Sequence, residues 1–223
     1  MTTAIIVAAG KSERMGAGTD KAFLSLVGKP VVAWSLLAFE RCPEIDSIIL
    51  VVRKDQVLAS KAVVKMFGIS KLAKVVAGGA KRQDSVKAGL AELDMDTRYV
   101  VIHDGARPLI TSDTIAEVVK LAKRYPAATV GHRMTDSVKR VLKGAIVSAS
   151  ENREQLWAVQ TPQAFQVKTL REAYKKLEAN AVVTDDCQIV ELAGETVRIF
   201  ETRRPNLKIT TVEDLQIAAA LLK

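Results

Sequence analysis

The chain has few of the residues that usually mark a disulfide framework or a metal centre. Its 223 residues include two cysteines, Cys42 and Cys187, which lie far apart without CxxC spacing, and two histidines, His103 and His132. A disulfide framework, a zinc site and a histidine-based metal site are therefore not expected.

Long apolar runs and blocks of positive charge are also missing. No apolar run reaches the ~20 residues that span a bilayer, and Met1-Thr2-Thr3 leads into strand-like sequence without the features of a secretory signal. We therefore expect a cytoplasmic protein with no membrane partner. The net charge of +8 favours anionic ligands. Lysines and arginines are spread along the chain and aromatics make up 4%, so nucleic acid is not the expected partner. We expect instead a site for several phosphates; the alternative is simply a basic surface.

The first loop is the most informative stretch. A short apolar run at residues 4–8 is followed by Ala9-Gly10-Lys11-Ser12-Glu13-Arg14-Met15-Gly16-Ala17-Gly18-Thr19-Asp20-Lys21. A glycine-rich, cation-bearing loop after a buried strand can present backbone N–H groups to phosphates. We therefore expect it to hold a nucleoside triphosphate with help from Arg14 and Lys21; an ordinary surface loop is the alternative.

Two better-known phosphate loops fail on spacing. Gly10-Lys11-Ser12 resembles the end of a P-loop, but Ile5 stands where that motif needs glycine. Gly16-Ala17-Gly18 begins a dinucleotide fingerprint, but Lys21 occupies its third glycine position. The P-loop ATPase and NAD-binding patterns are thus both excluded.

Strand-like and helix-like stretches alternate along the chain. We expect strands at 4–8, 45–53, 73–77, 99–102, from 128, 196–200 and 207–209. We expect helices from 30 to about 42, at 55–67, 84–93, around 115–122, at 167–177, 184–192 and, behind a capping box of Thr210 and Glu213, through 222. Apolar strands between helices predict an α/β fold with a mainly parallel sheet covered on both faces.

The polar stretch from Arg133 to about Ala158 breaks this pattern. It contains a hairpin-like piece, 137–142 and 145–150, around Lys143-Gly144. We expect one domain over residues 1–223 with an arm at about 133–158; an ordinary surface hairpin is the alternative.

Polar clusters follow several of the expected strands. Because ligands of open α/β sheets bind at the carboxyl ends of strands, one site should collect the cations Arg14, Lys21, Arg82, Arg107 and Lys208 around Asp104. One acid among several cations suits a triphosphate that shares its charge with a divalent metal. Taken singly, Ser85 could cap the helix it begins, Asp104 could be a buried turn acid, and His103 is better explained as a packed residue than as a catalyst.

Several motifs together carry a family resemblance. They are Ala8-Ala9-Gly10 with Arg14-Met15 and Lys21, Gly78-Gly79-x-x-Arg82-x-x-Ser85-Val86, His103-Asp104-Gly105-Ala106-Arg107-Pro108, Asp136-Ser137-Val138-Lys139, Leu156-Trp157, Thr161-Pro162-Gln163, Thr184-Asp185-Asp186 and Lys208-Ile209-Thr210. Over nearly its whole length the sequence resembles the 2-C-methyl-D-erythritol 4-phosphate cytidylyltransferases of the non-mevalonate isoprenoid pathway.

This resemblance implies a Rossmann-like three-layer sandwich with a protruding β-hairpin arm that pairs two subunits. It implies that CTP and methylerythritol phosphate react with Mg²⁺, or another divalent cation, to give 4-diphosphocytidyl-methylerythritol and pyrophosphate by in-line attack. It also implies roles for individual residues. The catalytic residues would be Arg14, Lys21, Arg153 and Lys208, and CTP would be bound by Ala8, Ala9, Gly10, Gly78, Arg82, Ser85 and Asp104. The sugar phosphate would be bound by Arg107, Ser137, Arg153, Thr161 and Lys208, and the metal would contact Asp104.

The sequence departs from the family in several places, one of them beside Lys21, and two rival functions remain. Asp20 stands where the family usually has proline, and an acid there could partly neutralise Lys21. A cytidylyltransferase for ribitol 5-phosphate would share the nucleotide half, although Ala106 beside Arg107 favours methylerythritol phosphate. A non-catalytic nucleotide- or RNA-binding protein on the same fold would bind without releasing pyrophosphate.

Overall fold

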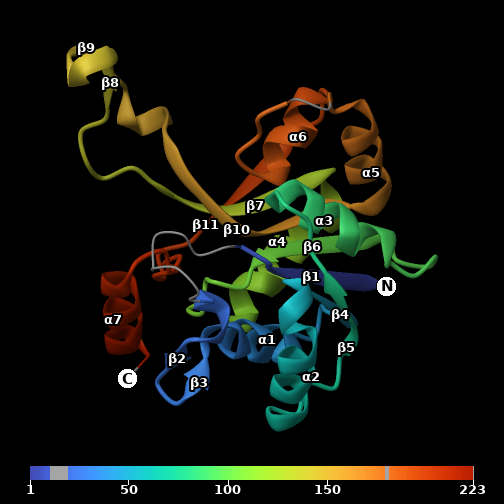
Figure 1. The fold of residues 1–223 in the computed structure, drawn as a ribbon. Coiled ribbons are helices and arrows are strands. Elements are labelled where there is room, and N and C mark those ends of the chain that lie inside the picture. Colours follow the sequence, from blue (N-terminus) through green and yellow to red (C-terminus); the bar gives the residue numbers. More distant parts are fainter. Residues whose placement is uncertain (11–19, 179–180, 223) are drawn as a thin grey trace.

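The computed structural model describes residues 1–10, 20–178 and 181–222, so Arg14 lies outside the described residues. Its main feature is a seven-stranded sheet in the order β11-β7-β10-β6-β1-β4-β5, shown in Figure 1. Every neighbouring pair in it is parallel except the two pairs made by β10. The predicted α/β fold with a mainly parallel sheet is confirmed.

The elements alternate as the sequence predicts. The strands are β1 (Thr2–Ala8), β2 (Ser25–Leu26), β3 (Lys29–Pro30), β4 (Ser47–Val52), β5 (Leu72–Ala77), β6 (Tyr99–Asp104), β7 (Ala127–Arg133), β8 (Lys139–Val141), β9 (Val147–Ser150), β10 (Trp157–Gln166) and β11 (Val197–Glu201). The α-helices are α1 (Val31–Arg41), α2 (Val57–Met66), α3 (Arg82–Ala91), α4 (Ser112–Arg124), α5 (Val167–Lys176), α6 (Asp186–Leu192) and α7 (Val212–Leu221). Short 3₁₀ turns are η2 (Lys21–Phe23), η3 (Lys54–Gln56), η4 (Lys143–Ala145) and η5 (Arg153–Gln155).

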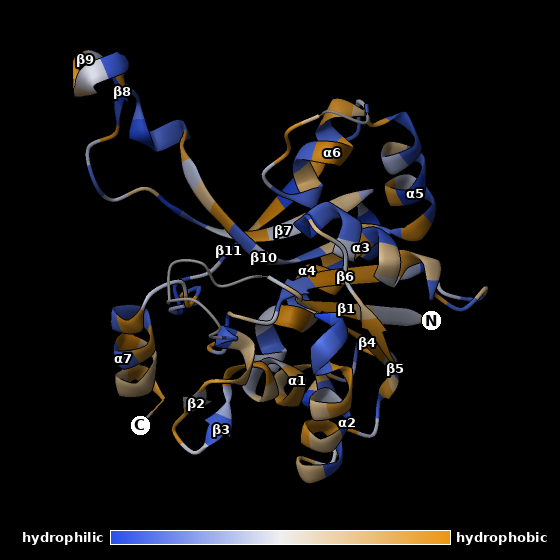
Figure 2. Cartoon of the chain, in the orientation of Figure 1, coloured by the Kyte–Doolittle hydropathy of each residue, from blue (hydrophilic) through white to orange (hydrophobic). Residues whose placement is uncertain are grey.

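Helices cover both faces of the sheet, which makes three layers. Successive residues of a strand point to opposite faces, so Ile6 of β1 packs in the cluster of α1, α2 and α4, while Ile5 packs in the cluster of α3, α5 and α6. Helix α3 lies very close to β1, because a Cβ added at Gly89 would come within 2.6 Å of Ile5 Cγ2. Figure 2 shows the resulting apolar interior along the central strands. No helix of the described residues is long and apolar enough to cross a membrane.

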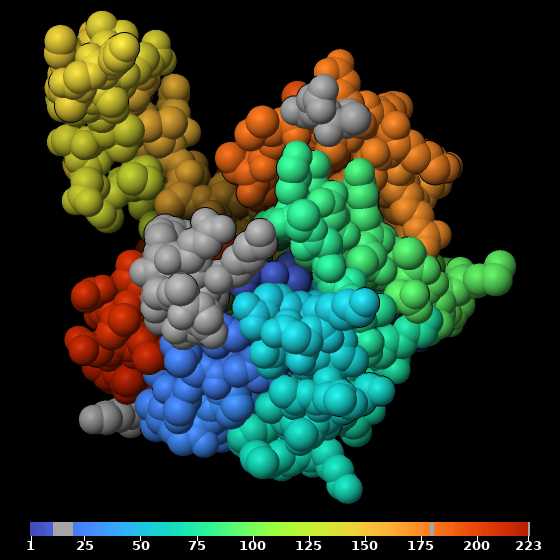
Figure 3. Space-filling view, in the orientation of Figure 1, coloured from blue at the N-terminus to red at the C-terminus, as the bar shows by residue number. Residues whose placement is uncertain are grey.

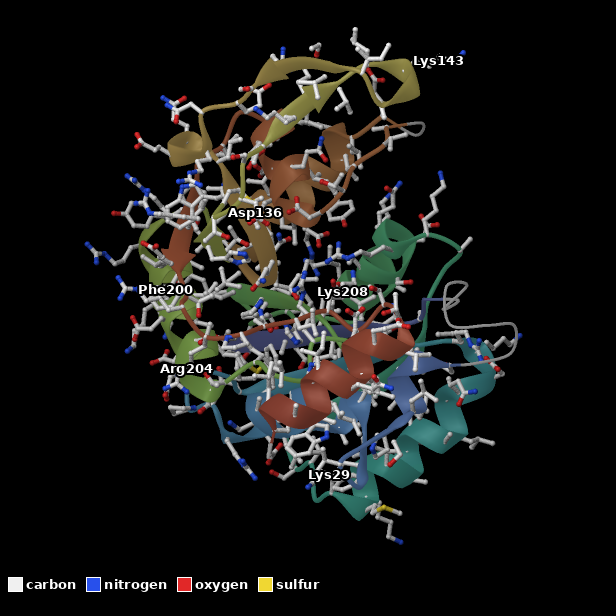
Figure 4. All side chains as sticks on the ribbon, turned by 90° about the vertical axis from the view of Figure 1, so that its left-hand side faces the viewer. Lys29, Asp136, Lys143, Phe200, Arg204 and Lys208 are labelled. Carbon is white, nitrogen blue, oxygen red and sulfur yellow. The ribbon has the colours of Figure 1, made fainter. Side chains whose placement is uncertain are left out.

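The arm is a separate feature of the outline. Strands β8 and β9 pair as an antiparallel hairpin, which stands away from the rest of the molecule in Figure 1 and Figure 3. Lys143 lies at its far end in Figure 4. The predicted protruding β-hairpin is confirmed; its use in dimerisation stays a prediction.

Three local predictions are wrong. Residues 157–166 form β10 between β6 and β7, although the sequence suggested no strand there; a register shift between Gln160 and Gln163 accommodates Pro162. Residues 207–209 form no strand; the Ile209 N–H donates to the Ala106 carbonyl at 2.8 Å. The last helix is capped one residue later, by Thr211 with Asp214.

Candidate active site

A pocket opens at the edge of the sheet where β1, β5 and β6 end. The carboxyl ends of parallel strands meet at one edge, and the loops that follow these strands line the pocket together with η2 and the segment before α7. The lining residues are Val7, Ala8, Ala9, Gly10, Asp20, Lys21, Ala22, Gly79, Ala80, Lys81, Arg82, Ser85, Asp104, Ala106 and Lys208. The strand-end prediction therefore brought Lys21, Arg82, Asp104 and Lys208 together correctly.

Asp104, the last residue of β6, is the electrostatic centre of the pocket. Its Oδ1 lies 3.1 Å from Nε of Arg82, and its Oδ2 lies 2.7 Å from Nζ of Lys208 and 3.9 Å from Nε of Arg107. Burial alone would raise the pKa of Asp104, but these three cations outweigh it and hold the pKa well below its usual range. Asp104 is therefore a carboxylate at any physiological pH. This pairing replaces the alternative in which it only bonds turn amides.

The segment before α7 docks on the turn that follows Asp104. Arg107 Nη1 donates to the Asn206 carbonyl at 2.8 Å, and the Ile209 N–H donates to the Ala106 carbonyl at 2.8 Å. Asn206 is buried and donates from Nδ2 to the Thr161 carbonyl at 2.8 Å. These contacts carry Lys208 to Asp104 from the far end of the chain, as Figure 4 shows in the labelled position of Lys208 at the middle of the molecule.

His103 and Thr161 form a buried chain of hydrogen bonds behind Asp104. The Asp104 N–H donates to Thr161 Oγ1 at 3.0 Å, and Thr161 Oγ1 lies 3.1 Å from His103 Nδ1. Nε2 of His103 lies 3.3 Å from the Arg107 carbonyl. A proton on Nε2 satisfies every bond, because Thr161 then donates to Nδ1 and His103 donates to the carbonyl. Burial lowers the pKa of His103 to about 3, so the ring stays neutral.

These hydrogen bonds bear on the predictions for His103 and Thr161. His103 has no exposed surface, and its ring centroid lies 5.1 Å from that of Phe39 in a tilted arrangement, which agrees with a packed residue. Thr161 is only 4% exposed, and its hydroxyl is engaged in the interior. Its contact with a sugar phosphate stays a prediction; in this structure the hydroxyl fixes the backbone of Asp104.

The loop after β5 approaches the first loop with no room for side chains. A Cβ at Gly78 would lie 2.5 Å from Ala9 Cβ and 2.6 Å from Ser85 Oγ. Ser85 is buried inside the first turn of α3, where its hydroxyl accepts from the Gly79 N–H at 3.1 Å and donates to the Lys81 carbonyl at 3.3 Å. The alternative in which Ser85 caps the helix is wrong, since α3 begins at Arg82. Its contact with CTP stays a prediction.

Asp20 does not act mainly on Lys21. Its Oδ1 accepts from the Ala22 N–H at 3.1 Å, and its Oδ2 lies 3.4 Å from Nε of Arg53 at the end of β4. Burial raises the pKa of Asp20, while the Ala22 amide and Arg53 oppose that rise more strongly than Lys21 does. The departure from proline therefore supplies a cap for η2, the turn that begins with Lys21.

The arm residues lie apart from the pocket within one chain. Ser137 and Arg153 are exposed and are not among the pocket residues. Arg153 Nη1 donates to the Thr135 carbonyl within the arm. The roles of Ser137 and Arg153 at a sugar-phosphate site, and the pairing of two chains through the arm, stay predictions.

The sequence alone did not assign a second acid near the site. Asp186, at the start of α6, is fully buried and accepts from Arg82 Nη1 at 2.6 Å and from the Tyr174 hydroxyl at 2.6 Å. The Thr184-Asp185-Asp186 motif was the available signal, but the motif alone does not indicate that Asp186 contacts Arg82. Tyr174 has no sequence signal, since it reads as one more residue on the apolar side of α5.

The chain is similar over nearly its whole length to several named proteins. A relative in Dehalococcoides mccartyi named 2-C-methyl-D-erythritol 4-phosphate cytidylyltransferase is 44% identical over 220 residues, which cover 99% of this chain and 95% of the relative. One of the same name in Alkaliphilus metalliredigens is 42% identical over 222 residues, with 99% and 92% covered. The crystal structure of 4-diphosphocytidyl-2C-methyl-D-erythritol synthase from Anaerococcus prevotii superposes with a TM-score of 0.87 at 32% identity, covering 99% of this chain and 97% of that one.

The family model agrees along the whole described chain. The model for 2-C-methyl-D-erythritol 4-phosphate cytidylyltransferase matches residues 2–223, which include the pocket, the arm and the last helix. The chain therefore belongs to the 2-C-methyl-D-erythritol 4-phosphate cytidylyltransferase family.

Proposed function

We propose that this chain transfers CMP from CTP to 2-C-methyl-D-erythritol 4-phosphate by in-line attack, with pyrophosphate as the leaving group. The observation that carries the proposal is the cluster of Arg82, Arg107 and Lys208 on the single carboxylate Asp104, at the strand ends of a cytidylyltransferase-family chain. Such a cluster suits two phosphate-bearing substrates that meet in one pocket.

The reaction needs little proton chemistry. A phosphate oxygen of methylerythritol phosphate, already anionic, forms a bond to the α-phosphorus of CTP. The bond from that phosphorus to the bridging oxygen breaks, and pyrophosphate leaves with the electron pair. A general base is not needed, which fits the buried, neutral state of His103. The barrier is the approach of one anion to another, so positioning and positive charge supply the catalysis.

The pocket divides between the two substrates. On the CTP side we assign Lys21, together with Arg14, to the triphosphate; Arg82 and Asp104 to the nucleotide; and the backbone around Ala8, Ala9, Gly10 and Gly78, with Ser85, to the base. On the other side we assign Arg107, Thr161 and Lys208 to the sugar phosphate. Lys208 is the most exposed of the cations on Asp104, with 37% of its side chain accessible, and can therefore reach a second substrate.

A divalent cation fits this pocket only when it arrives with the nucleotide. The described residues contain no cluster of three or more His, Cys, Asp or Glu side chains that could hold a metal. Asp104 is one carboxylate with cations on both oxygens. Mg²⁺ commonly binds through one or two carboxylates plus substrate phosphates, so Asp104 would offer one ligand and the triphosphate the others. The ion would supply charge neutralisation on the phosphates.

We also propose that the protein acts as a homodimer through the arm. Ser137 and Arg153 would then reach the sugar-phosphate side of the pocket of the second chain. The exposed apolar side chains Val141, Leu142, Ile146 and Val147 on the hairpin support this, since a second chain could cover them.

The test is pyrophosphate release by the purified protein with CTP and Mg²⁺, with methylerythritol phosphate and ribitol 5-phosphate offered in parallel. Release with methylerythritol phosphate alone is the expected result. Release with ribitol 5-phosphate alone would keep the chemistry and overturn the substrate. CTP binding without release in either reaction would favour the non-catalytic alternative.

A further inference from the structure

The Thr184-Asp185-Asp186 motif has no part in the proposed chemistry, yet it is tied to the pocket. Asp186 has no exposed surface, so its charge needs partners inside the protein. Its Oδ1 accepts from the Tyr174 hydroxyl at 2.6 Å, and its Oδ2 accepts from Arg82 Nη1 at 2.6 Å. Both oxygens are thus engaged, one by α5 and one by the first residue of α3.

A second motif fixes the backbone that carries Asp186. Gln163 of β10 donates from Nε2 to Asp185 Oδ2 at 2.8 Å, and its Oε1 accepts from the Asp186 N–H at 3.2 Å. Asp185 Oδ1 also caps α6 by accepting from the Gln188 N–H at 2.9 Å. Gln163 is only 1% exposed. The start of α6 is therefore held rigidly to the central sheet, and Asp186 is aimed from it at Arg82.

These contacts hold both sides of the Arg82 guanidinium. Nη1 lies 2.6 Å from Asp186 Oδ2, and Nε lies 3.1 Å from Asp104 Oδ1. Its Nη2 is buried and has no hydrogen-bond partner in the described part of the chain. An arginine fixed by two carboxylates, with the N–H groups of Nη2 left over, is suited to meet an oxygen of a bound nucleotide.

We propose that Asp186 and Tyr174 are positioning residues for CTP binding, which act through Arg82. The Tyr174 hydroxyl fixes the Asp186 carboxylate, Asp186 fixes the guanidinium, and Arg82 in turn holds Asp104 in place. The part of this inference that concerns CTP binding rests on the proposed function. It gives the Thr184-Asp185-Asp186 and Thr161-Pro162-Gln163 motifs a shared task, which is to set the geometry of one pocket arginine from outside the pocket.

A double-mutant cycle tests whether Tyr174 acts through Arg82. Tyr174→Phe removes one oxygen and keeps the packing, and it should raise the KM for CTP about fivefold while kcat and the KM for methylerythritol phosphate stay within about twofold. In an Arg82→Ala background, Tyr174→Phe should have no further effect on the KM for CTP. The matched control is Thr111→Ala, which removes the side chain that caps α4 on the other face of the sheet.

The outcomes separate a positioning role from a structural one. Equal effects of Tyr174→Phe in both backgrounds would overturn the proposal, and so would a KM change no larger than that of the control. If the wild-type protein releases no pyrophosphate, the proposed function fails, and the positioning role is then read from the NMR signal of the Arg82 Nε–H. Tyr174→Phe should shift and broaden that signal and Thr111→Ala should not; an unchanged signal would refute the role.

Discussion

Lowering the pH should destabilise this protein through His103. The ring has no exposed surface, and burial lowers its pKa from 6.5 to about 3. In the unfolded chain the same ring gains a proton near pH 6.5. The folded protein therefore has the full contribution of His103 above that pH and loses it progressively as the pH falls toward 3.

The magnitude follows from the two pKa values. Each pH unit below 6.5 should cost about 1.4 kcal/mol of the free energy of unfolding. Between about pH 7.5 and about pH 4.5 the loss from His103 is then about 2–3 kcal/mol. Asp104, whose pKa is depressed, adds its own loss mainly below the usual range of an aspartate, so the window above about pH 4.5 separates the histidine from Asp104.

The assay is urea unfolding at a series of pH values in metal-free buffer, with wild type, His103→Asn and His132→Asn. Asparagine can still accept a hydrogen bond from Thr161 and does not titrate. The free energy of unfolding of His103→Asn should therefore be lower than that of wild type by an amount set by the substitution, and it should not show the fall with pH that His103 causes. His132 is exposed in the folded protein, so His132→Asn is the control for the loss of a histidine outside the interior. Other groups, including Asp20 with its raised pKa, cancel in the difference. Equal slopes for wild type and His103→Asn would refute the reasoning.

The remaining predictions concern the phosphate loop, the arm and the core. Lys21→Ala and Arg14→Ala should each lower kcat by roughly 10²-fold or more, as expected for one lost transition-state charge, and near-normal pyrophosphate release in either would contradict the assignment. Arg153→Ala should raise the KM for methylerythritol phosphate and leave that for CTP nearly unchanged; a selective loss of CTP affinity would show that the arm is misassigned. Gly89→Ala should lower the free energy of unfolding by about 1–3 kcal/mol in a urea titration, because the new methyl would lie 2.6 Å from Ile5 Cγ2; unchanged stability would mean that α3 can move off the sheet.

Most of the fold could be predicted because apolar strands and amphipathic helices leave periodic patterns. Strand β10 could not, because Gln160, Thr161, Pro162 and Gln163 have the composition of a loop. The strand nevertheless lies inside the sheet, between β7 and β6, since its buried polar groups pair with others: Thr161 with His103, and Gln163 with the start of α6. The pattern of residues along one segment cannot show that its buried polar groups find hydrogen-bond partners in another segment, so such a strand is missed.

The site divides in the same way. Lys21, Arg82, Asp104 and Lys208 could be placed together because each lies near the end of a strand or the start of a helix at one edge of the sheet. The contact of Asp186 with Arg82 joins residues 104 positions apart and depends on how α6 packs. The contact of Asp20 with Arg53 was missed for a related reason, since Arg53 is its neighbour in space but comes from the end of another strand.

The charges on Asp104 also indicate how the pocket can accept substrates. Without this carboxylate, Arg82, Arg107 and Lys208 would repel one another; with it they stay close before any phosphate arrives, which is preorganisation. The cations are not equally free to leave. Arg82 contacts two carboxylates and has 27% of its side chain exposed, whereas Lys208 contacts Asp104 and has 37% exposed. An incoming phosphate should therefore draw Lys208 away from Asp104 at lower cost than Arg82, which stays fixed by Asp186. This asymmetry supports a fixed cation for the nucleotide and a movable one for the sugar phosphate.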